Sequence, residues 1–309
     1  MSYLANLMLR LTGPATRLPE NLRRRHARML AGAQSDDGGF AGREGSGDLY
    51  YTSFALRGLT MLGRLDRETA TLAAVFLKDH LDRSMPSIDF LSLVHGAVLL
   101  EATGCNDVFA EAGRDRSRMV ADLIEAFRRD DGGYAKTERG PKSSTYHTFL
   151  AVSCKQLVGL PLEGADRIIE LIRSRRRPDG GFVEVARLGQ SGTNPTAAAV
   201  GLLAMLEAID PPTRQDAVRF LASMQNSEGG LRANTRIPVA DLLSTFTGLV
   251  ALADLDGLTS LDLAAVRRYV EALEQPEGGF RGGAWDDAAD VEYTFYGLGS
   301  LALLATLEA

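Results

Sequence analysis

The chain has 309 residues, of which 45% are hydrophobic and 24% charged, which is the composition of a folded globular protein with a substantial core. The net charge of -6 indicates no general attraction to nucleic acid or to anionic membranes, so no nucleic-acid partner is expected. The two cysteines, Cys105 and Cys154, exclude a disulfide framework and a cysteine-rich zinc cluster. No signal peptide and no membrane-spanning stretch is recognisable, so we expect a cytoplasmic protein.

A motif with two consecutive glycines recurs along the chain. It reads DDGGF at 36–40, DDGGY at 130–134, PDGGF at 178–182, SEGGL at 227–231 and PEGGF at 276–280. The later motifs follow one another at steps of 48 or 49 residues, and the first gap of 94 residues leaves room for one repeat without the glycines. The sequence therefore predicts six structural repeats.

A nearly apolar helix is expected after each motif, starting near 48, 89, 144, 194, 241 and 290. The first residues are all common helix caps: Asp48, Asp89, Ser144, Asn194, Asp241 and Asp290. Seven positions further on, each repeat has a small residue that would let two helices approach closely: Ala55, Gly96, Ala151, Gly201, Gly248 and Gly297. An amphipathic helix precedes each motif, as in RQDAVRFLASMQ.

Six buried helices alternating with six amphipathic ones predict an all-α fold, an (α/α)6 toroid in which an inner ring lies inside an outer ring. We expect one domain over 1–309, with 1–19 as a short N-terminal extension. An open solenoid is the alternative. We prefer the closed ring because six units complete it.

The loops that carry the glycines would then lie together at one end of the toroid, where the N-termini of the inner helices converge and favour an anion. Arg232, Arg236 and Arg281 lie on these loops and would add positive charge, unless acidic residues of the loops balance them. The first turns of the inner helices carry many aromatic residues, and the candidate ligand-binding ones are Tyr51, Tyr146, Phe246, Tyr293 and Tyr296. About half of the aromatic residues must pack between helices. The rest predict an apolar funnel that suits an amphiphile such as a prenyl diphosphate.

The repeated turns and helix pairs between about 20 and 309 resemble the β subunits of protein prenyltransferases, particularly the Rab geranylgeranyltransferase type, and more distantly the squalene and terpene cyclases. The resemblance implies a toroid that uses geranylgeranyl or farnesyl diphosphate and works with a helical α subunit, which this chain does not contain.

The resemblance also implies where a zinc site would lie. The family holds zinc with an Asp, a Cys two residues later and a His on the next inner helix. Asp241 matches the Asp, but Leu243 and Tyr293 stand at the other two positions, so we expect no zinc site of this kind. Magnesium is expected only together with a bound diphosphate.

The stretch DDAAD at 286–290 has a spacing with which metal-dependent isoprenoid enzymes hold magnesium-bound diphosphate. Because Asp290 aligns with the helix caps, we interpret the stretch mainly as a turn followed by a cap rather than a metal site. The acid motif DxDD of the cyclases is incomplete, since AWDD at 284–287 begins with Ala. No complete catalytic set is recognisable, and the candidate residues are Asp241, His147, Asp286 and Asp287.

Three functions remain open from the sequence. The first is a prenyltransferase-like protein that binds an isoprenoid in the funnel. The second is a non-catalytic toroid that binds a lipid, a peptide or a partner protein, and the third is a terpene cyclase-like enzyme. Loss of the family's metal ligands favours the second, whereas the aromatic residues and loop arginines favour the first.

Overall fold

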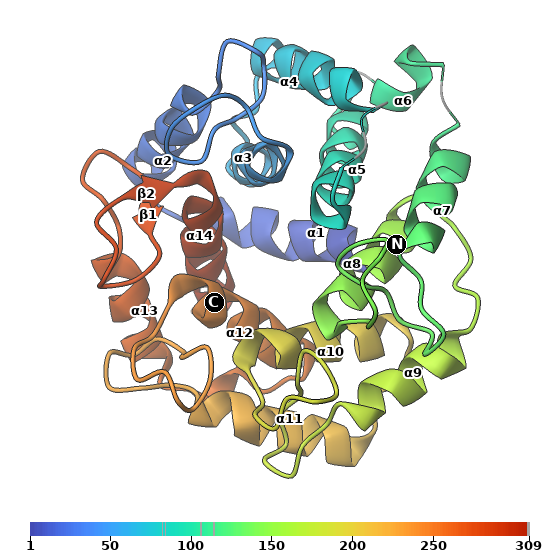
Figure 1. The fold of residues 1–309 in the computed structure, drawn as a ribbon. Coiled ribbons are helices and arrows are strands. Elements are labelled where there is room, and N and C mark those ends of the chain that lie inside the picture. The colour runs from blue at the N-terminus through green and yellow to red at the C-terminus, as the bar shows by residue number, and fades with distance from the viewer. Residues whose placement is uncertain (82, 84, 106, 114, 308–309) are drawn as a thin grey trace.

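A computed structural model describes residues 1–81, 83, 85–105, 107–113 and 115–307, so the last two residues of the expected domain lie outside the described part. The helices form two concentric rings (Figure 1). Each inner helix packs against the next one along the chain, and the last packs against the first, which closes the ring. The predicted α/α toroid is therefore confirmed. The inner helices are α3 (Leu49–Met61), α5 (Ser87–Ala102), α8 (Thr145–Leu157), α10 (Thr193–Met205), α12 (Leu242–Asp254) and α14 (Val291–Ala305).

The outer ring covers the inner helices with amphipathic helices. In one of them, α9, the buried residues Ile168 and Ile172 lie four positions apart on one face. The outer helices are α2 (Glu20–Gly32), α4 (Arg67–His80), α7 (Arg116–Ala126), α9 (Ala165–Ser174), α11 (Pro211–Ser223) and α13 (Leu263–Ala272). The shorter elements are α6 (Val108–Glu111), the 3-10 helix η1 (Leu258–Ser260) and a two-stranded antiparallel ribbon of β1 (Phe280–Arg281) and β2 (Ala289–Asp290).

A threonine in the first turn of five inner helices ties each helix to the loop before it. Its hydroxyl accepts a hydrogen bond of 2.8 to 3.1 Å from the N–H of the residue that follows the two glycines. In four of the five it also donates to the carbonyl of the residue four positions earlier. The buried N–H is thereby satisfied, and the turn is held against the helix. The threonines are Thr52, Thr148, Thr196, Thr245 and Thr294; α5, which no glycine pair precedes, has Phe90 at this position.

The predicted caps are confirmed for four of the inner helices and wrong for two. The side chains of Asp48, Ser144, Asp241 and Asp290 each accept from a backbone N–H three residues further on. Asp89 lies inside α5, whose cap is Pro86, and Asn194 lies inside α10, whose cap is Gly192. In α10 the carbonyl of Ala233 in the neighbouring loop accepts the first N–H at 2.9 Å, so that end does not depend on a capping side chain.

We had expected the recurring small residue to let two helices approach closely. In at least two repeats it has another role. A Cβ added at Gly297 would lie 2.4 Å from the ring of Phe280, and one at Gly248 would lie 2.4 Å from Leu231. Phe280 and Leu231 are the fully buried residues that follow the glycine pairs. In these repeats the small residue therefore makes room for the side chain that anchors the loop.

The last repeat packs directly on the first outer helix. His26 of α2 is buried, accepts the N–H of Gly279 at 2.8 Å and stacks on Phe280 with 4.8 Å between ring centroids. Its other ring nitrogen lies 2.9 Å from Glu274. These contacts join residues about 250 positions apart, so they belong to the closure of the toroid.

Most of residues 1–19, the expected N-terminal extension, form helix α1 (Tyr3–Ala15), which lies across the barrel (Figure 1). Tyr3 donates from its hydroxyl to Asp254 at the end of α12 (2.6 Å), and Arg10 pairs with the same carboxylate. Arg17 donates to the carbonyl of Ala305 at the end of α14 (3.2 Å). The helix therefore covers the end of the inner ring opposite the glycine loops. None of the described helices is both long and apolar enough to cross a membrane.

Candidate functional site

The inner ring encloses a cavity of about 450 Å³. Its lining begins in the first turns of the inner helices, with residues such as Tyr50, Tyr146 and Asn194, and ends on α1 with Leu4 and Leu7. The wall is mainly apolar. This size and character are typical of sites for small molecules.

One side of the cavity is built from four aromatic rings on three helices. Phe54 of α3, Phe246 of α12 and Phe295 and Tyr296 of α14 have centroids 5.2 to 6.0 Å apart. Most of these pairs meet edge to face, which is a favourable geometry for aromatic side chains. The rings therefore form a continuous apolar surface.

Among the described residues that line the cavity, Arg57 of α3 is the only arginine. Its guanidinium carbon lies 4.0 Å from the ring centroid of Phe54 and 4.6 Å from that of Phe295. Its Nε donates to the carbonyl of Ser53 at 3.2 Å, and no ion pair joins Arg57 to another described residue. Burial lowers the pKa of Arg57, but a guanidinium stays charged in proteins.

His95 of α5 also lines the cavity. Burial, and next the nearby charge of Arg57, lower its pKa to about 3. The imidazole is therefore neutral at physiological pH and offers one N–H donor and one acceptor nitrogen.

A carboxyl group lies behind the aromatic wall near the glycine loops. The hydroxyl groups of Tyr50 and Tyr296 both donate to Oε1 of Glu292, at 2.6 and 3.1 Å. Burial raises the pKa of Glu292, against the effect of these two hydrogen bonds. The protonated form of Glu292 is thus more accessible than that of an exposed glutamate.

Of the five aromatic residues that the sequence indicated for ligand binding, the structure places three in the cavity wall: Tyr146, Phe246 and Tyr296. Tyr51 and Tyr293 instead cover glycines in the loops. A Cβ at Gly42 would lie 2.6 Å from the ring of Tyr51, and one at Gly282 would lie 2.6 Å from that of Tyr293.

The three arginines expected at the rim are not among the residues that line the cavity. Arg232 donates to the carbonyl of Ser223 at 3.0 Å, and Arg281 to that of Ala272 at 3.3 Å. Both carbonyls belong to the last turns of outer helices, where carbonyl groups lack partners within the helix and attract cations. Arg236 lies exposed on its loop. The charged loop residue that does line the cavity is Glu184.

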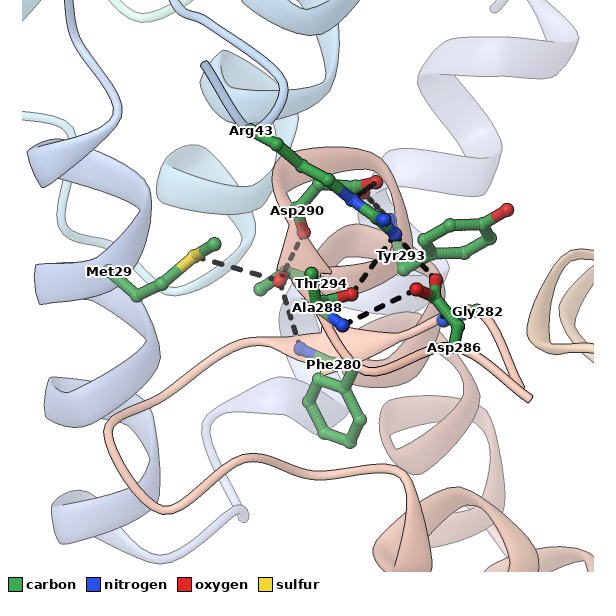
Figure 2. Close-up of polar contacts among 9 residues, drawn as sticks. All are labelled: Met29, Arg43, Phe280, Gly282, Asp286, Ala288, Asp290, Tyr293 and Thr294. Carbon is green, nitrogen blue, oxygen red and sulfur yellow. Dashed lines mark hydrogen bonds and ion pairs between the residues drawn. The ribbon is translucent and has the colours of Figure 1, made fainter. Parts of the chain in front are cut away.

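The DDAAD stretch joins the last repeat to the first (Figure 2). Arg43, from the first glycine loop, pairs with Asp286 and with Asp290 (3.4 Å) and donates to the carbonyl of Ala288 at 3.0 Å. Burial acts to raise the pKa of Asp286, but hydrogen bonds from Arg43 and from two backbone N–H groups outweigh burial and lower this pKa. Asp290 caps α14, which confirms its predicted capping role, and Asp287 is exposed.

The described residues contain no group of three or more His, Cys, Asp or Glu side chains placed to hold a metal ion. At the positions that correspond to the family's zinc ligands, Asp241 accepts from the N–H and hydroxyl of Ser244 at 2.6 and 2.9 Å. Leu243 and Tyr293 supply neither thiolate nor imidazole. This donor set does not fit a zinc ion.

His147 and Asp241, two of the candidate catalytic residues, are engaged at helix starts. Nδ1 of His147 lies 2.7 Å from the hydroxyl of the cap Ser144, and burial lowers the pKa of His147 to about 4. Neither His147 nor Asp241 lines the central cavity.

The family model for the prenyltransferase alpha-alpha toroid domain matches residues 21–77 and 78–309. The chain belongs to the prenyltransferase alpha-alpha toroid family. A search of curated proteins found no match.

Solved structures share the fold of this toroid at low sequence identity. Protein geranylgeranyltransferase-I of Candida albicans, in complex with GGPP, is similar over 91% of this chain and 91% of its own, with a TM-score of 0.72 and 15% identity. A variant of the type II terpene cyclase MstE from Scytonema, in complex with its product merosterolic acid A, covers 98% of this chain and 99% of its own, with a TM-score of 0.64 and 14% identity. An alpha-1,6-mannanase from Salegentibacter covers 96% and 99%, with a TM-score of 0.63 and 12% identity. Because one fold carries such different activities, the ligand has to be argued from the cavity.

Sequence reasoning missed Arg57, His95 and Glu292, and it counted Tyr50 among the aromatic residues of the first turns without choosing it as a ligand-binding residue. A signal for the first two was present, since each is the one basic side chain of a mostly apolar inner helix, LYYTSFALRGLTM or SIDFLSLVHGAVLLEA. Both lie nine residues after the cap of their helix, at the same level of the barrel.

Proposed function

We propose that this toroid binds an isoprenoid-type amphiphile in its central cavity. The observation that carries the proposal is the cavity of about 450 Å³ whose wall is formed by aromatic and aliphatic side chains of all six inner helices. Burying an isoprenoid chain against such a wall contributes about 25 cal/mol per Å² of apolar area, before the costs of association. The family and the complex of the similar geranylgeranyltransferase with GGPP support the same ligand class.

A prenyl diphosphate is the form of this ligand that the family favours. Its head group would lie at the glycine loops, where the positive ends of the inner-helix dipoles converge. Since Arg232 and Arg281 are turned to outer-helix carbonyls, that head group would depend on the helix ends rather than on these arginines. The helical α subunit that the family resemblance implies as a partner of this chain stays a prediction.

Calorimetric titration with geranylgeraniol and with geranylgeranyl diphosphate tests the proposal. Ala197 of α10 lines the cavity, so an Ala197→Phe change should fill part of it and weaken binding of both ligands at least about tenfold. Ala126→Phe, on an exposed position of α7, is the matched control and should bind like the parent. Absence of binding to either ligand by folded parent protein would overturn the proposal.

A cyclase-like activity is the second candidate, and Glu292 is the observation that favours it. A buried carboxylic acid with a raised pKa is a proton donor of the kind that general acid catalysis requires. For this step the hydroxyl of Tyr50 or Tyr296 would turn to accept the proton of protonated Glu292 and would pass its own proton to an alkene carbon of the bound chain, which leaves Glu292 as the carboxylate. The resulting carbocation would close a ring and then lose a proton, which restores the acid.

For this activity we expect Glu292→Gln to lower the yield of cyclised product at least about 100-fold while the parent's affinity for geranylgeraniol is kept. Glu277→Gln, on an exposed loop position, is the control. Product analysis by gas chromatography with mass spectrometry measures the effect. If the parent releases no cyclic product from linear polyprenyl substrates, the cyclase proposal fails and binding alone is left.

A further inference from the structure

Arg57 is a partly buried cation in the cavity wall that forms no ion pair with another described residue, although Glu292 is near enough for its charge to act on Arg57. Burying an unpaired charge in an apolar environment is unfavourable, and proteins ordinarily compensate for it with an opposite charge. Stacking on Phe54 and Phe295 offsets part of this cost, because the faces of aromatic rings attract cations. No carboxylate of the described residues supplies the rest through an ion pair.

The acidic groups near the cavity have other partners. Glu292 accepts from the hydroxyl groups of Tyr50 and Tyr296. Glu184, which lines the cavity from its loop, accepts the N–H of Tyr146 at 3.3 Å. The thiol of Cys154, also in the wall, stays neutral because burial raises its pKa.

The guanidinium of Arg57 is held in place on three sides. Its Nε is bonded to the carbonyl of Ser53, and two aromatic rings lie against its face. Its two terminal Nη groups have no hydrogen-bond partner among the described residues. His95, close enough for the charge of Arg57 to act on it, lines the same cavity with a neutral imidazole that can donate one further N–H.

We propose that Arg57 and His95 form a binding site for one carboxylate group deep in the cavity, so that the ligand is an isoprenoid acid that enters with its carboxylate first. This proposal rests on the proposed function and specifies its ligand. The planar fork of an arginine matches a carboxylate in two parallel hydrogen bonds. A diphosphate carries more negative charge than one guanidinium can neutralise, and it would remain at the glycine loops.

The test compares geranylgeranoic acid, geranylgeraniol and geranylgeranyl diphosphate by calorimetry. The parent protein should bind the acid about 10- to 100-fold more tightly than the alcohol, and more tightly than the diphosphate. Arg57→Gln should bring the affinity for the acid down to that for the alcohol and leave the alcohol within about twofold of the parent value. Arg64→Gln, which removes an exposed arginine just after the same helix, is the matched control and should change neither affinity.

A second measurement uses the unaltered protein and does not depend on how the variants fold. Geranylgeranoic acid labelled with carbon-13 in its carboxyl group is titrated by NMR in the bound state. A carboxylate paired with Arg57 should have a pKa below that of the free acid, because an adjacent cation favours the charged form. A carboxyl group in the apolar wall or at the loops near Glu184 should have a raised pKa.

The outcomes separate this proposal from the proposed function. If the alcohol binds but the acid binds no better, if Arg57→Gln weakens both ligands equally, or if the bound carboxyl pKa is raised, the carboxylate site is refuted and isoprenoid binding stands. If neither the alcohol nor the acid nor the diphosphate binds, the proposed function itself fails.

Discussion

Replacement of Gly229 by alanine is expected to lower the free energy of unfolding by roughly 3 to 5 kcal/mol. Gly229 has a φ of +97°, a conformation that residues with a Cβ rarely adopt. A Cβ there would lie 2.3 Å from the carbonyl oxygen of Ala265 on the next outer helix, α13. Backbone atoms cannot move aside as a flexible side chain can, so the loop would have to leave its place between two repeats.

The matched control is Gly63→Ala. Gly63 also has a positive φ, of +64°, but a Cβ there meets nothing within 4 Å. This change should cost only about 1 kcal/mol, the expense of the left-handed conformation alone. Urea unfolding followed by circular dichroism measures both variants. Equal losses in the two would show that the close approach to α13 contributes nothing.

The same approach recurs around the ring, which explains why the first glycine of the pair is repeated. A Cβ at Gly38 would lie 2.4 Å from the carbonyl oxygen of Leu72, and one at Gly180 would lie 2.5 Å from that of Asp216. At Gly278 the nearest atom is the carbonyl oxygen of Arg25, at 2.8 Å. Each loop therefore rests on the following outer helix, and the last one rests on the first.

Asp254→Ala is expected to lower the free energy of unfolding by roughly 2 to 4 kcal/mol. The side chain of Asp254 is only 6% exposed, and it accepts the hydroxyl of Tyr3 and pairs with Arg10. Burial, and next the charge of Asp254, raise the pKa of Tyr3. Alanine would leave a buried hydroxyl without an acceptor and would release α1 from α12. We also expect faster proteolysis of α1.

Glu20→Ala provides the comparison for this change, because it also removes a carboxylate that has two side-chain partners. Glu20 is half exposed and binds Arg23 and Arg64 on the surface. Surface ion pairs contribute little, so the loss should stay within about 1 kcal/mol. Thermal melting and limited trypsin digestion compare the two variants. An Asp254→Ala protein that melts and is cleaved like the parent would mean that α1 is held by its apolar contacts alone.

Much of the architecture could be predicted because it depends on neighbours in the chain. Caps such as Asp241 and Asp290 act on N–H groups three residues away, and the apolar character of the inner helices is visible in any one repeat. The two wrong caps, Asp89 and Asn194, show the limit of this reasoning. At α10 the cap is Gly192, which has no side chain to recognise as a cap, and a carbonyl from the neighbouring loop bonds the first N–H as it also does at α8 and α12.

The candidate site could be predicted less well because it depends on the direction of long side chains. Tyr146, Phe246 and Tyr296 lie near the starts of inner helices and line the cavity, while their role in ligand binding stays a prediction. An arginine side chain is long enough to point either into the cavity or toward an outer helix. Arg232 turns outward to a carbonyl of α11, whereas Arg57, inside an inner helix, has the cavity as its surroundings.

The sequence by itself determined the repeats, the alternation of apolar and amphipathic helices and the glycine turns, since each of these is encoded within a few neighbouring positions. Only the tertiary structure decided that α1 covers one end of the barrel, that Arg43 binds the DDAAD stretch and that Arg57 and His95 share one cavity. These contacts join parts of the chain that closure of the ring brings together; Arg43 and Asp286, for instance, are separated by 243 positions. No local pattern records such a contact, because its energy depends on where the last repeat meets the first.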